Sequence, residues 1–378
     1  MPKDLSIGFE PSCDPSLALG MTGVTELQIQ DVAFGGKGVA RIDGKAVFVP
    51  YVIDGESVSA SVTREHKKFF EAELENVIAP SPHRVEPRCP YFGRCGGCAY
   101  QHIEYEHQLA LKWRQVKETL RRIGGLREPP MRPFIPAPIE YGYRNRITVH
   151  VRDGVIGFFR RESNKLIAIE HCPIARGEVN AKLTELSASH PHDGHYTLRV
   201  IDGPRVFIQA NDEVAAAMLD LVDRLIAPAG GTLIDAYSGA GFFAKRLRAR
   251  FERVIGIDWD QRAIAIARKD ADENETYVAA DVETELSATL RSIASATGDR
   301  NSVVIVDPPA TGLSKMIVET LIEHQPTQLI YVSCNPATLA RDLVALKKSF
   351  RVDSITPLDM FPQTAEIEVT VKLTARGQ

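Results

Sequence analysis

The stretch Thr232-Leu-Ile-Asp-Ala-Tyr-Ser-Gly-Ala-Gly241 has the pattern of a short apolar strand that runs into a turn containing two glycines. Gly239 and Gly241 open a segment with helical periodicity. Glycines in such a turn let the backbone approach a nucleotide-like ligand closely. We therefore predict a strand, a ligand-binding turn and a helix in this order.

Four more apolar runs follow, separated by segments with helical spacing: RVIGID at 253–258, TYVAA at 276–280, SVVIVD at 302–307 and QLIYVSC at 328–334. This alternation predicts an α/β fold, with a doubly wound, Rossmann-like domain over residues 212–378. Ligands of such parallel sheets bind at the carboxyl ends of the strands, so the chemistry is expected there.

Acidic residues stand at the ends of three of these strands. Asp258 follows Asp235 by 23 residues, where a carboxylate can accept hydrogen bonds from both ribose hydroxyls. Asp281 follows the next strand and could face an adenine. The third glycine of the dinucleotide fingerprint is missing, because Phe243 or Ala244 occupies that region. The pattern therefore favours S-adenosylmethionine over a nicotinamide cofactor.

The last two predicted strands end in reactive groups. Asp307 is followed by two prolines, which make a stiff loop, and its carboxylate can accept a hydrogen bond from a base edge. Cys334 ends its strand beside a helix N-terminus, where a thiolate is expected to be stabilised and nucleophilic. The alternative for Cys334 is a small buried residue, as most single cysteines are.

A methyltransferase needs a thiolate when its target is carbon 5 of a uracil. Addition of the thiolate to carbon 6 creates an enolate whose carbon 5 can attack a methyl sulfonium. The carbon 5 proton must then be removed by a base, and Glu368 or Glu366, beside the final strand VTVKL, can be that base.

The N-terminal part is rich in short β-patterned runs between about Gly23 and Val77. Five such runs within 20–80 predict a small OB-like β-barrel, a fold that many proteins use to hold RNA. The alternative is a structural β-module.

Residues 81–211 are expected to form a central α+β region that contains a cysteine motif. A helix is predicted from Glu104 to Ile123, with one apolar face and one basic face, and strands at 145–152, 155–159 and 165–169. Four thiolates can hold zinc or an iron–sulfur cluster, and spacing alone does not separate them. The candidate metal ligands are Cys89, Cys95, Cys98 and Cys172.

Composition limits the class of protein. The chain has 378 residues, 44% of them hydrophobic, and no apolar run long enough to span a bilayer, so we expect a soluble, cytoplasmic protein without a membrane partner. Met1 to Gly20 lacks the pattern of a secretory leader. The net charge is −4, yet residues 101–165 carry 13 Lys and Arg against 7 Asp and Glu, a possible contact zone for a polyanion.

With these motifs in place, the chain resembles the RNA uracil-5-methyltransferases, in particular the branch that methylates 23S ribosomal RNA and carries a [4Fe-4S] cluster. The resemblance rests on DAYSGAG, VDPP, VSCNP and FPQTAEIE, on Cys89-x5-Cys95-Gly-Gly-Cys98 with the later Cys172-Pro173, and on an N-terminal part similar to the TRAM barrel. It implies S-adenosylmethionine and the cluster as cofactors.

The resemblance also implies roles for single residues. Cys334 matches the family's nucleophile and Glu368 its proton-abstracting base. Gln209 matches the glutamine that contacts the cofactor and the target base, and Phe207 matches the aromatic ring that packs on the flipped uracil. The remaining matches, at positions that bind S-adenosylmethionine or the base, are Tyr237, Gly239, Asp258 and Asp307.

Two departures leave alternatives open. Ala310 stands where the family usually has an arginine after Asp-Pro-Pro, and Glu366 stands where it has a histidine. The expected function is methylation of carbon 5 of a uridine in ribosomal RNA by a monomer. The alternatives are the same reaction on the transfer-RNA T-loop and a catalytically weak RNA-binding factor; a nicotinamide-dependent oxidoreductase fails on the glycine pattern.

Overall fold

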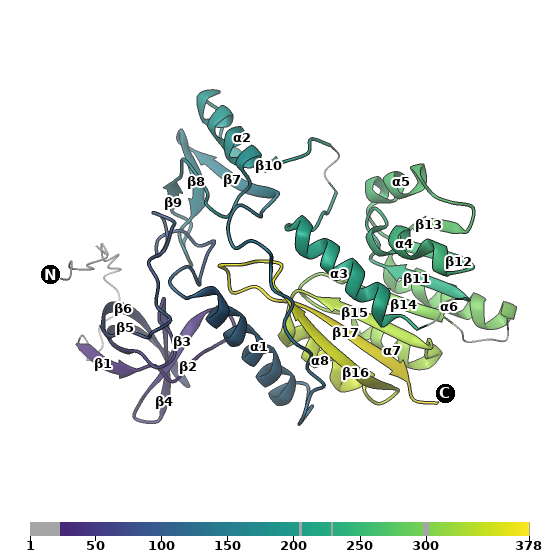
Figure 1. Ribbon diagram of the computed structural model, residues 1–378, viewed down its shortest axis with the longest axis horizontal. Helices are drawn as coiled ribbons and strands as arrows, with labels where there is room; N and C mark the ends of the chain where they lie inside the picture. The colour runs from purple at the N-terminus through teal and green to yellow at the C-terminus, as the bar shows by residue number, and fades with distance from the viewer. Residues whose placement is uncertain (1–22, 204–205, 228–229, 298–301, 378) are drawn as a thin grey trace.

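The structure is a computed structural model that describes residues 23–203, 206–227, 230–297 and 302–377. Within these residues the strands form three sheets, one near the N-terminus, one in the central part and one in the C-terminal part (Figure 1). The N-terminal stretch with Cys13 lies outside the described residues.

The N-terminal sheet has six strands, in the order β1-β5-β6-β4-β3-β2. Their bounds are β1 Val24–Gln28, β2 Asp31–Val32, β3 Lys37–Ile42, β4 Lys45–Pro50, β5 Ser57–Glu65 and β6 Phe69–Ala79. The first predicted run is divided into β1 and β2, because the chain changes partner there. The amide of Ile29 donates to Glu56 on the β5 side, whereas the amide of Gln30 donates to Val39 in β3. The prediction of a β-rich N-terminal region is confirmed.

The central sheet has four antiparallel strands, in the order β10-β7-β8-β9. They are β7 Arg146–Arg152, β8 Val155–Phe159, β9 Leu166–Ala168 and β10 Gly194–Arg199, and helix α2 Gly177–Ala188 packs on one face. The sequence predicted the first three of these strands. It did not predict α2 or β10, which pairs with β7 along six residue pairs.

The C-terminal sheet has seven strands, in the order β13-β12-β11-β14-β15-β17-β16. Five of them are parallel: β11 Thr232–Ala236, β12 Arg253–Asp258, β13 Glu275–Ala279, β14 Ser302–Val306 and β15 Gln328–Ser333. Strand β17 Glu368–Ala375 runs antiparallel between β15 and β16 Phe350–Leu358. The α/β expectation for this part is confirmed, although β16 was not predicted.

Helices cover both faces of this sheet (Figure 1). On one face, α3 Asp212–Leu225, α4 Phe242–Leu247 and α5 Gln261–Lys269 share an apolar core with the strands, and η1 Arg248–Arg250 follows α4. On the other face lie α6 Val282–Thr297, α7 Lys315–His324 and α8 Pro336–Leu346. Strands buried on both sides explain why their sequences are continuous apolar runs instead of alternating ones.

Helix α1, Tyr105–Arg122, follows the cysteine motif and packs on the C-terminal sheet beside α8. The prediction that one face of this helix is basic is wrong in one respect. Lys112 is fully buried, and its ammonium group donates to Asp359 at 2.6 Å and to the carbonyl of Phe361 at 3.1 Å. Gln108 and Gln115 are buried on the same helix. The periodicity gave the correct length of α1 but not its polar contacts.

The loop at 359–367, between β16 and β17, is held by residues that are far away in the sequence. Gln108 and Gln363 exchange two hydrogen bonds, from Gln108 Nε2 to Gln363 Oε1 at 3.0 Å and from the Gln363 amide to Gln108 Oε1 at 3.2 Å. The amides of Ala99 and Tyr100 both donate to the carbonyl of Gln363 at 3.0 Å. The segment directly after Cys98 is therefore in contact with the loop that leads to Glu368.

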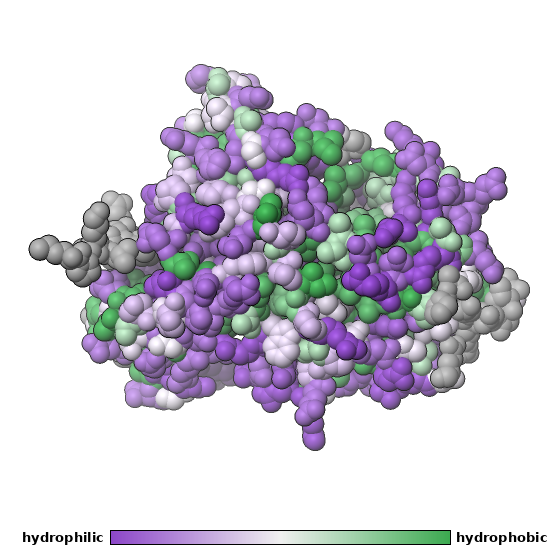
Figure 2. All heavy atoms as spheres, viewed as in Figure 1, coloured by the Kyte–Doolittle hydropathy of each residue, from purple (hydrophilic) through white to green (hydrophobic). Residues whose placement is uncertain are grey.

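Every helix in the described part of the chain is too short or too polar to span a bilayer. On the face in Figure 2, hydrophilic residues cover most of the surface, and hydrophobic residues form small groups between them.

Candidate active site

The turn after β11 forms the first part of the site. Tyr237, Gly239 and Gly241 have φ angles of 68°, 54° and 87°, which lie in the left-handed region. A Cβ atom added to Gly239 would have no atom within 4 Å, so the turn faces open space there. The amide of Gly239 donates to Asp258 at 2.8 Å and joins this turn to the end of β12.

Asp258 is positioned by backbone donors on both of its oxygens. Oδ2 accepts from the Gly239 amide, and Oδ1 accepts from the Asp260 amide at 2.8 Å. Each carboxylate oxygen keeps a further lone pair, so a diol can still be bound. Asp281 instead accepts a hydrogen bond from the Thr284 amide at the start of α6, and its side chain is exposed.

Two polar atoms near this turn have no protein partner. Asp235 Oδ1 and Ser238 Oγ are buried without a hydrogen bond, whereas Asp235 Oδ2 accepts from the Ala244 amide. Burial, together with the charges of Asp307 and Asp258, raises the pKa of Asp235 to about 7. Unsatisfied buried groups beside open space are the expected features of a ligand site. The acidic and polar edge fits S-adenosylmethionine, which has an ammonium group, a sulfonium and a ribose.

Trp259 was missed by sequence reasoning. It directly follows Asp258, and its side chain is 73% exposed, although large aromatic groups normally lie at least partly inside. An exposed indole beside a carboxylate that can bind a ribose is available for stacking on a planar base. The signal was present in the sequence as a tryptophan next to the acidic residue at a strand end.

The second part of the site combines the ends of β14, β15 and β17. Ser333 pairs with Val369 across the β15–β17 ladder, and this register places Cys334 opposite Glu368. Glu368 is buried, and Asp307 follows β14. Gln209 Nε2 donates to Asp307 Oδ2 at 3.4 Å. The structure thus brings together four residues that are far apart in the sequence.

The carboxylates in this cluster affect the pKa values of Glu368 and Cys334. Burial and the charges of Asp307 and Glu366 raise the pKa of Glu368 well above its usual range, and burial also raises the pKa of Asp307. Burial and the charges of Glu368 and Asp307 raise the pKa of Cys334 to about 12. The expectation of a stabilised thiolate is therefore wrong. The nearby helix N-terminus does not outweigh burial and the negative neighbours.

Residues of α8 hold the loop after Asp307. Asn335 Nδ2 and Thr338 Oγ1 each donate to the carbonyl of Ala310 at 3.1 Å. Arg341 Nη2 donates to the carbonyls of Thr311 and Leu313. Ala310 itself is exposed, so the departure from the usual arginine lies on the rim of the site, on a loop whose backbone is held independently of it.

Phe207 is 62% exposed, so it is not part of a hydrophobic core. The guanidinium carbon of Arg146 lies 5.2 Å from the centre of its ring. Phe207 belongs to the same short segment as Gln209, which is buried. The segment therefore presents a free aromatic face two residues from the polar contact with Asp307.

Comparison with known proteins agrees with this geometry. The sequence model of the tRNA (uracil-5-)-methyltransferase family matches residues 191–376, and that of the TRAM domain matches residues 24–74. An uncharacterized RNA methyltransferase of Bdellovibrio bacteriovorus is 31% identical over 92% of this chain and 94% of its own length.

The chain belongs to the RNA (uracil-5-)-methyltransferase family. A second relative, an uncharacterized RNA methyltransferase of Halalkalibacterium halodurans, is 28% identical over 94% of this chain and 97% of its own. The crystal structure of Pyrococcus abyssi tRNA (uracil-54, C5)-methyltransferase with S-adenosyl-L-homocysteine has the same fold, with a TM-score of 0.70, 24% identity, and coverage of 93% of this chain and all of the other. The protein is an S-adenosylmethionine-dependent RNA methyltransferase.

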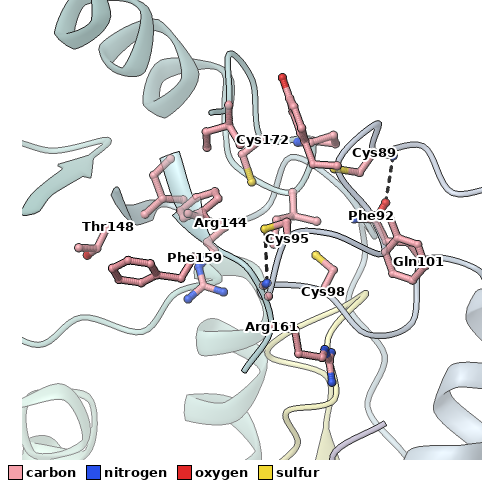
Figure 3. Close-up of a pocket in the computed structure, with 18 of the residues that line it drawn as sticks. Cys89, Phe92, Cys95, Cys98, Gln101, Arg144, Thr148, Phe159, Arg161 and Cys172 are labelled. Atoms are coloured by element: carbon pink, nitrogen blue, oxygen red, sulfur yellow. Dashed lines mark hydrogen bonds between the residues drawn. The ribbon is translucent and has the colours of Figure 1, made fainter. Parts of the chain in front are cut away.

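In this methyltransferase the four cysteines of the central region line one cavity of about 830 Å³ (Figure 3). Burial raises the pKa of Cys98 to about 12 and that of Cys172 to about 11, and each of these thiols is also affected by other cysteines of the set. The thiols are therefore near neighbours although Cys172 is distant in the sequence.

The structure does not support the expected metal site at these thiols. Among the described residues, no three His, Cys, Asp or Glu side chains lie close enough together to hold one metal ion. The shared cavity brings the four thiols near one another without identifying a metal ion or a cluster.

Proposed function

We propose that the protein methylates carbon 5 of a specific uridine in 23S ribosomal RNA, with Cys334 as the nucleophile and Glu368 as the base. The observation that carries the proposal is the juxtaposition of Cys334, Glu368 and Asp307 at three neighbouring strand ends. A thiol and a buried carboxylate beside a cofactor site are the two groups that uracil methylation at carbon 5 requires.

In the proposed reaction, Cys334 forms and releases a covalent bond to the uracil, and Glu368 removes a proton. The Cys334 thiol first gives its proton to water, and Sγ adds to carbon 6 of the uracil while the electrons of the C5=C6 bond move onto carbon 5 and the adjacent carbonyl. When bound, S-adenosylmethionine would supply the methyl group to carbon 5 as an electrophilic sulfonium and leave as the uncharged thioether S-adenosyl-L-homocysteine. The Glu368 carboxylate then removes the proton from carbon 5. The C5=C6 bond forms again, and the Sγ–C6 bond breaks.

The other polar residues orient the reactants. We assign the cofactor to Gln209, Tyr237, Gly239, Asp258 and Asp307, and the face of the flipped uracil to Phe207. The hydrogen bond from Gln209 to Asp307 supports a role for this pair in holding the edge of the base, since an amide and a carboxylate can together match an imide.

We also propose that Cys89, Cys95, Cys98 and Cys172 hold a [4Fe-4S] cluster. Methyl transfer moves no electrons, so the cluster's contribution is structural. The support is the shared cavity and the contact between Gln363 and the segment after Cys98. A brown protein with iron and sulfide in equal amounts is expected after anaerobic purification, and a colourless protein with one zinc would contradict the assignment.

Different parts of the chain have different roles in this proposal. We propose that residues 20–80 and the central region at 81–211 grip the RNA, while residues 212–378 carry out the transfer. The alternative substrate is the T-loop uridine of transfer RNA, which the name of the Pyrococcus abyssi protein specifies for that enzyme. The TRAM match supports RNA as the partner of this chain without separating the two substrates.

Covalent trapping tests the proposal. Transcripts of 23S ribosomal RNA segments and of transfer RNA, each made with 5-fluorouridine, are incubated with the anaerobically purified enzyme and S-adenosylmethionine. Fluorine at carbon 5 blocks the final proton removal, so an adduct that resists denaturing electrophoresis is expected with ribosomal RNA. Cys334→Ala must abolish it.

Other outcomes have clear meanings. An adduct with transfer RNA alone would keep the chemistry and overturn the substrate. The absence of an adduct with both RNAs, together with RNA binding, would favour the weakly catalytic binding factor.

A further inference from the structure

The two faces of the central sheet differ in character. The inward positions of β7, such as Ile147 and Val149, pack against Val179 and Leu183 of α2. The outward positions follow from the register of the four strands and contain no Asp or Glu. They are Arg146, Thr148, His150 and Arg152 in β7, His195, Thr197 and Arg199 in β10, Val155, Gly157 and Phe159 in β8, and Leu166 and Ala168 in β9. We call this surface the arginine face.

Several arginines on and around this face have no carboxylate partner in the described part of the chain. In the described part of the chain, no carboxylate lies within ion-pair distance of Arg144, Arg146, Arg152, Arg160 or Arg161, whereas ten other arginines, such as Arg84 and Arg250, have such a partner. Burial and the neighbouring guanidinium groups lower the pKa of Arg146. Cations gathered without counter-charges favour a polyanion as ligand.

The basic residues of the zone at 101–165 are divided between helix α1 and the central sheet. On α1, Arg114 pairs with Asp31 and Asp54, while Arg121 and Arg122 pair with Glu118. The charges of the helix are therefore largely satisfied. Arg146 and Arg152, which belong to the same zone and have no such partner, lie on the central sheet.

Aromatic rings lie among these cations. The rings of His150 and Phe159 are 4.3 Å apart with a tilt of 38°, and the guanidinium carbon of Arg152 lies 5.9 Å from the centre of Phe159. At the other end of β7, Arg146 contacts Phe207. Thr148 and Thr197 share a hydrogen bond between these two ends. Aromatic rings next to arginines on an open sheet are the arrangement on which unpaired bases stack.

The geometry points to the arginine face as the binding surface for an unpaired stretch of the RNA substrate. We propose that one base beside the target uridine stacks on the His150–Phe159 pair, while Arg146 and Arg152 hold phosphates. This inference rests on the proposed function, because Phe207 marks the place of the target base. His150 lies about 13 Å from Arg146 along β7, so the stacked base is a different nucleotide from the target.

The test uses the full-length protein and a short single-stranded RNA that contains 2-aminopurine, whose fluorescence falls on stacking. Wild-type protein is expected to quench the probe. Phe159→Leu keeps an apolar side chain but loses the flat ring, so it should remove the quenching and weaken binding about 5- to 140-fold. Arg146→Gln and Arg152→Gln should each reduce the slope of log affinity against log salt by about 0.7.

Arg122→Gln is the matched control, because it removes a charge from an exposed arginine of α1 that is paired with Glu118. It should leave quenching and affinity unchanged. Affinity for S-adenosyl-L-homocysteine, measured in every variant, shows that the fold is intact.

Several results would overturn the inference. These are a wild-type protein that does not bind the probe, quenching that survives Phe159→Leu, salt slopes equal to that of Arg122→Gln, or equally tight binding of a fully paired RNA. Wild-type trapping on 5-fluorouridine RNA reports on the proposed function separately, since it can succeed when the arginine-face variants behave like wild type.

Discussion

Cys334 is surrounded by negative groups, and these set the ionisation of its thiol. Glu368, Asp307 and Glu366 all act to raise its pKa in addition to burial. A thiol in such a place is protonated at neutral pH and gains nucleophilicity only when a cation arrives or protons leave. The sulfonium of the cofactor is the cation that the proposed reaction brings to this edge of the sheet.

Alkylation of Cys334 is therefore expected to depend strongly on pH. Because the pKa is raised to about 12, the thiolate fraction and the rate of reaction with iodoacetamide should rise about tenfold per pH unit from pH 7 to pH 10. At pH 8 S-adenosylmethionine, which carries a sulfonium, should increase the rate relative to the uncharged thioether S-adenosyl-L-homocysteine. Mass spectrometry of the Cys334 peptide measures this, with Cys334→Ala as the background. A rate that levels off near pH 8 would contradict the prediction.

Glu368→Gln should separate addition from release. The glutamine has the same shape but cannot remove the carbon 5 proton, so methylated RNA should accumulate as a covalent complex while turnover falls about 10²- to 10⁴-fold. Labelled methyl groups on denaturing gels report the complex. The exposed Glu366 gives the matched variant Glu366→Gln, which should keep its turnover. The reverse pattern would move the base to Glu366.

At the scale of single elements, the sequence predicted what depends on local pattern. The five apolar runs correspond to β11 through β15, because continuous apolar strands and strand-end residues are local signals. Strand β2 and helix α2 were missed, since β2 has two residues and α2 has only a weak apolar face. The burial of Lys112 could not be predicted, because its partner Asp359 is 247 residues away.

Gln108→Leu should impair catalysis without weakening cofactor binding. The leucine removes both hydrogen bonds to Gln363 and loosens the loop at 359–367, so kcat should fall while the affinity for S-adenosyl-L-homocysteine stays the same. Gln115→Leu is the matched control on the same helix, because Gln115 bonds to Val32, Ala33 and Tyr100 instead of to this loop.

Both glutamine variants should lose about 1–3 kcal/mol of stability, since each leaves buried groups unpaired. Only Gln108→Leu should lose activity beyond the fraction unfolded. Equal losses of kcat in the two variants would show that the effect is not specific to the loop.

Lys112→Met should destabilise the protein by about 3–5 kcal/mol, because it leaves the buried carboxylate of Asp359 without its cation. The double variant Lys112→Met with Asp359→Leu removes both charges and should recover a large part of this loss. Unfolding in urea, followed by circular dichroism, gives the comparison. A double variant as unstable as the single one would show that packing, and not the charge, dominates at this position.

At the scale of the whole molecule, the three sheets are linked through α1 and the cysteine region. Gln115 contacts the N-terminal sheet region, Gln108 contacts the 359–367 loop, and the amide of Gly96 in the cysteine region donates to the carbonyl of Phe159 in the central sheet at 3.0 Å. The sequence predicted which kinds of secondary structure each region contains, but it carried no signal for these contacts between the regions.

Removal of the proposed cluster should loosen the link between the cysteine region and the catalytic loop. Chelation under oxidising conditions is expected to accelerate hydrogen exchange at the amides of Ala99 and Tyr100, which donate to Gln363. Methyl transfer should decrease, while S-adenosyl-L-homocysteine binds as before. Cys334→Ala, which leaves the four cluster ligands intact, should keep both the colour and the slow exchange. Unchanged exchange after complete loss of colour would contradict a structural role for the cluster.

The 359–367 loop is held by residues that are far away in the sequence, and this limits how parts of the enzyme can be transplanted or fused. Residues 212–378 contain the turn after β11 and all residues of the Cys334 cluster except Gln209, yet the groups that hold this loop come from residues 99–112 and from residues 135–143, where Tyr143 donates to the carbonyl of Pro362 at 3.0 Å. A transplanted C-terminal part would keep the proposed cofactor site and lose the contacts that hold the loop before the proposed base. New targeting modules can therefore be joined to such an enzyme only outside the segments that hold this loop, at 98–112 and 135–143.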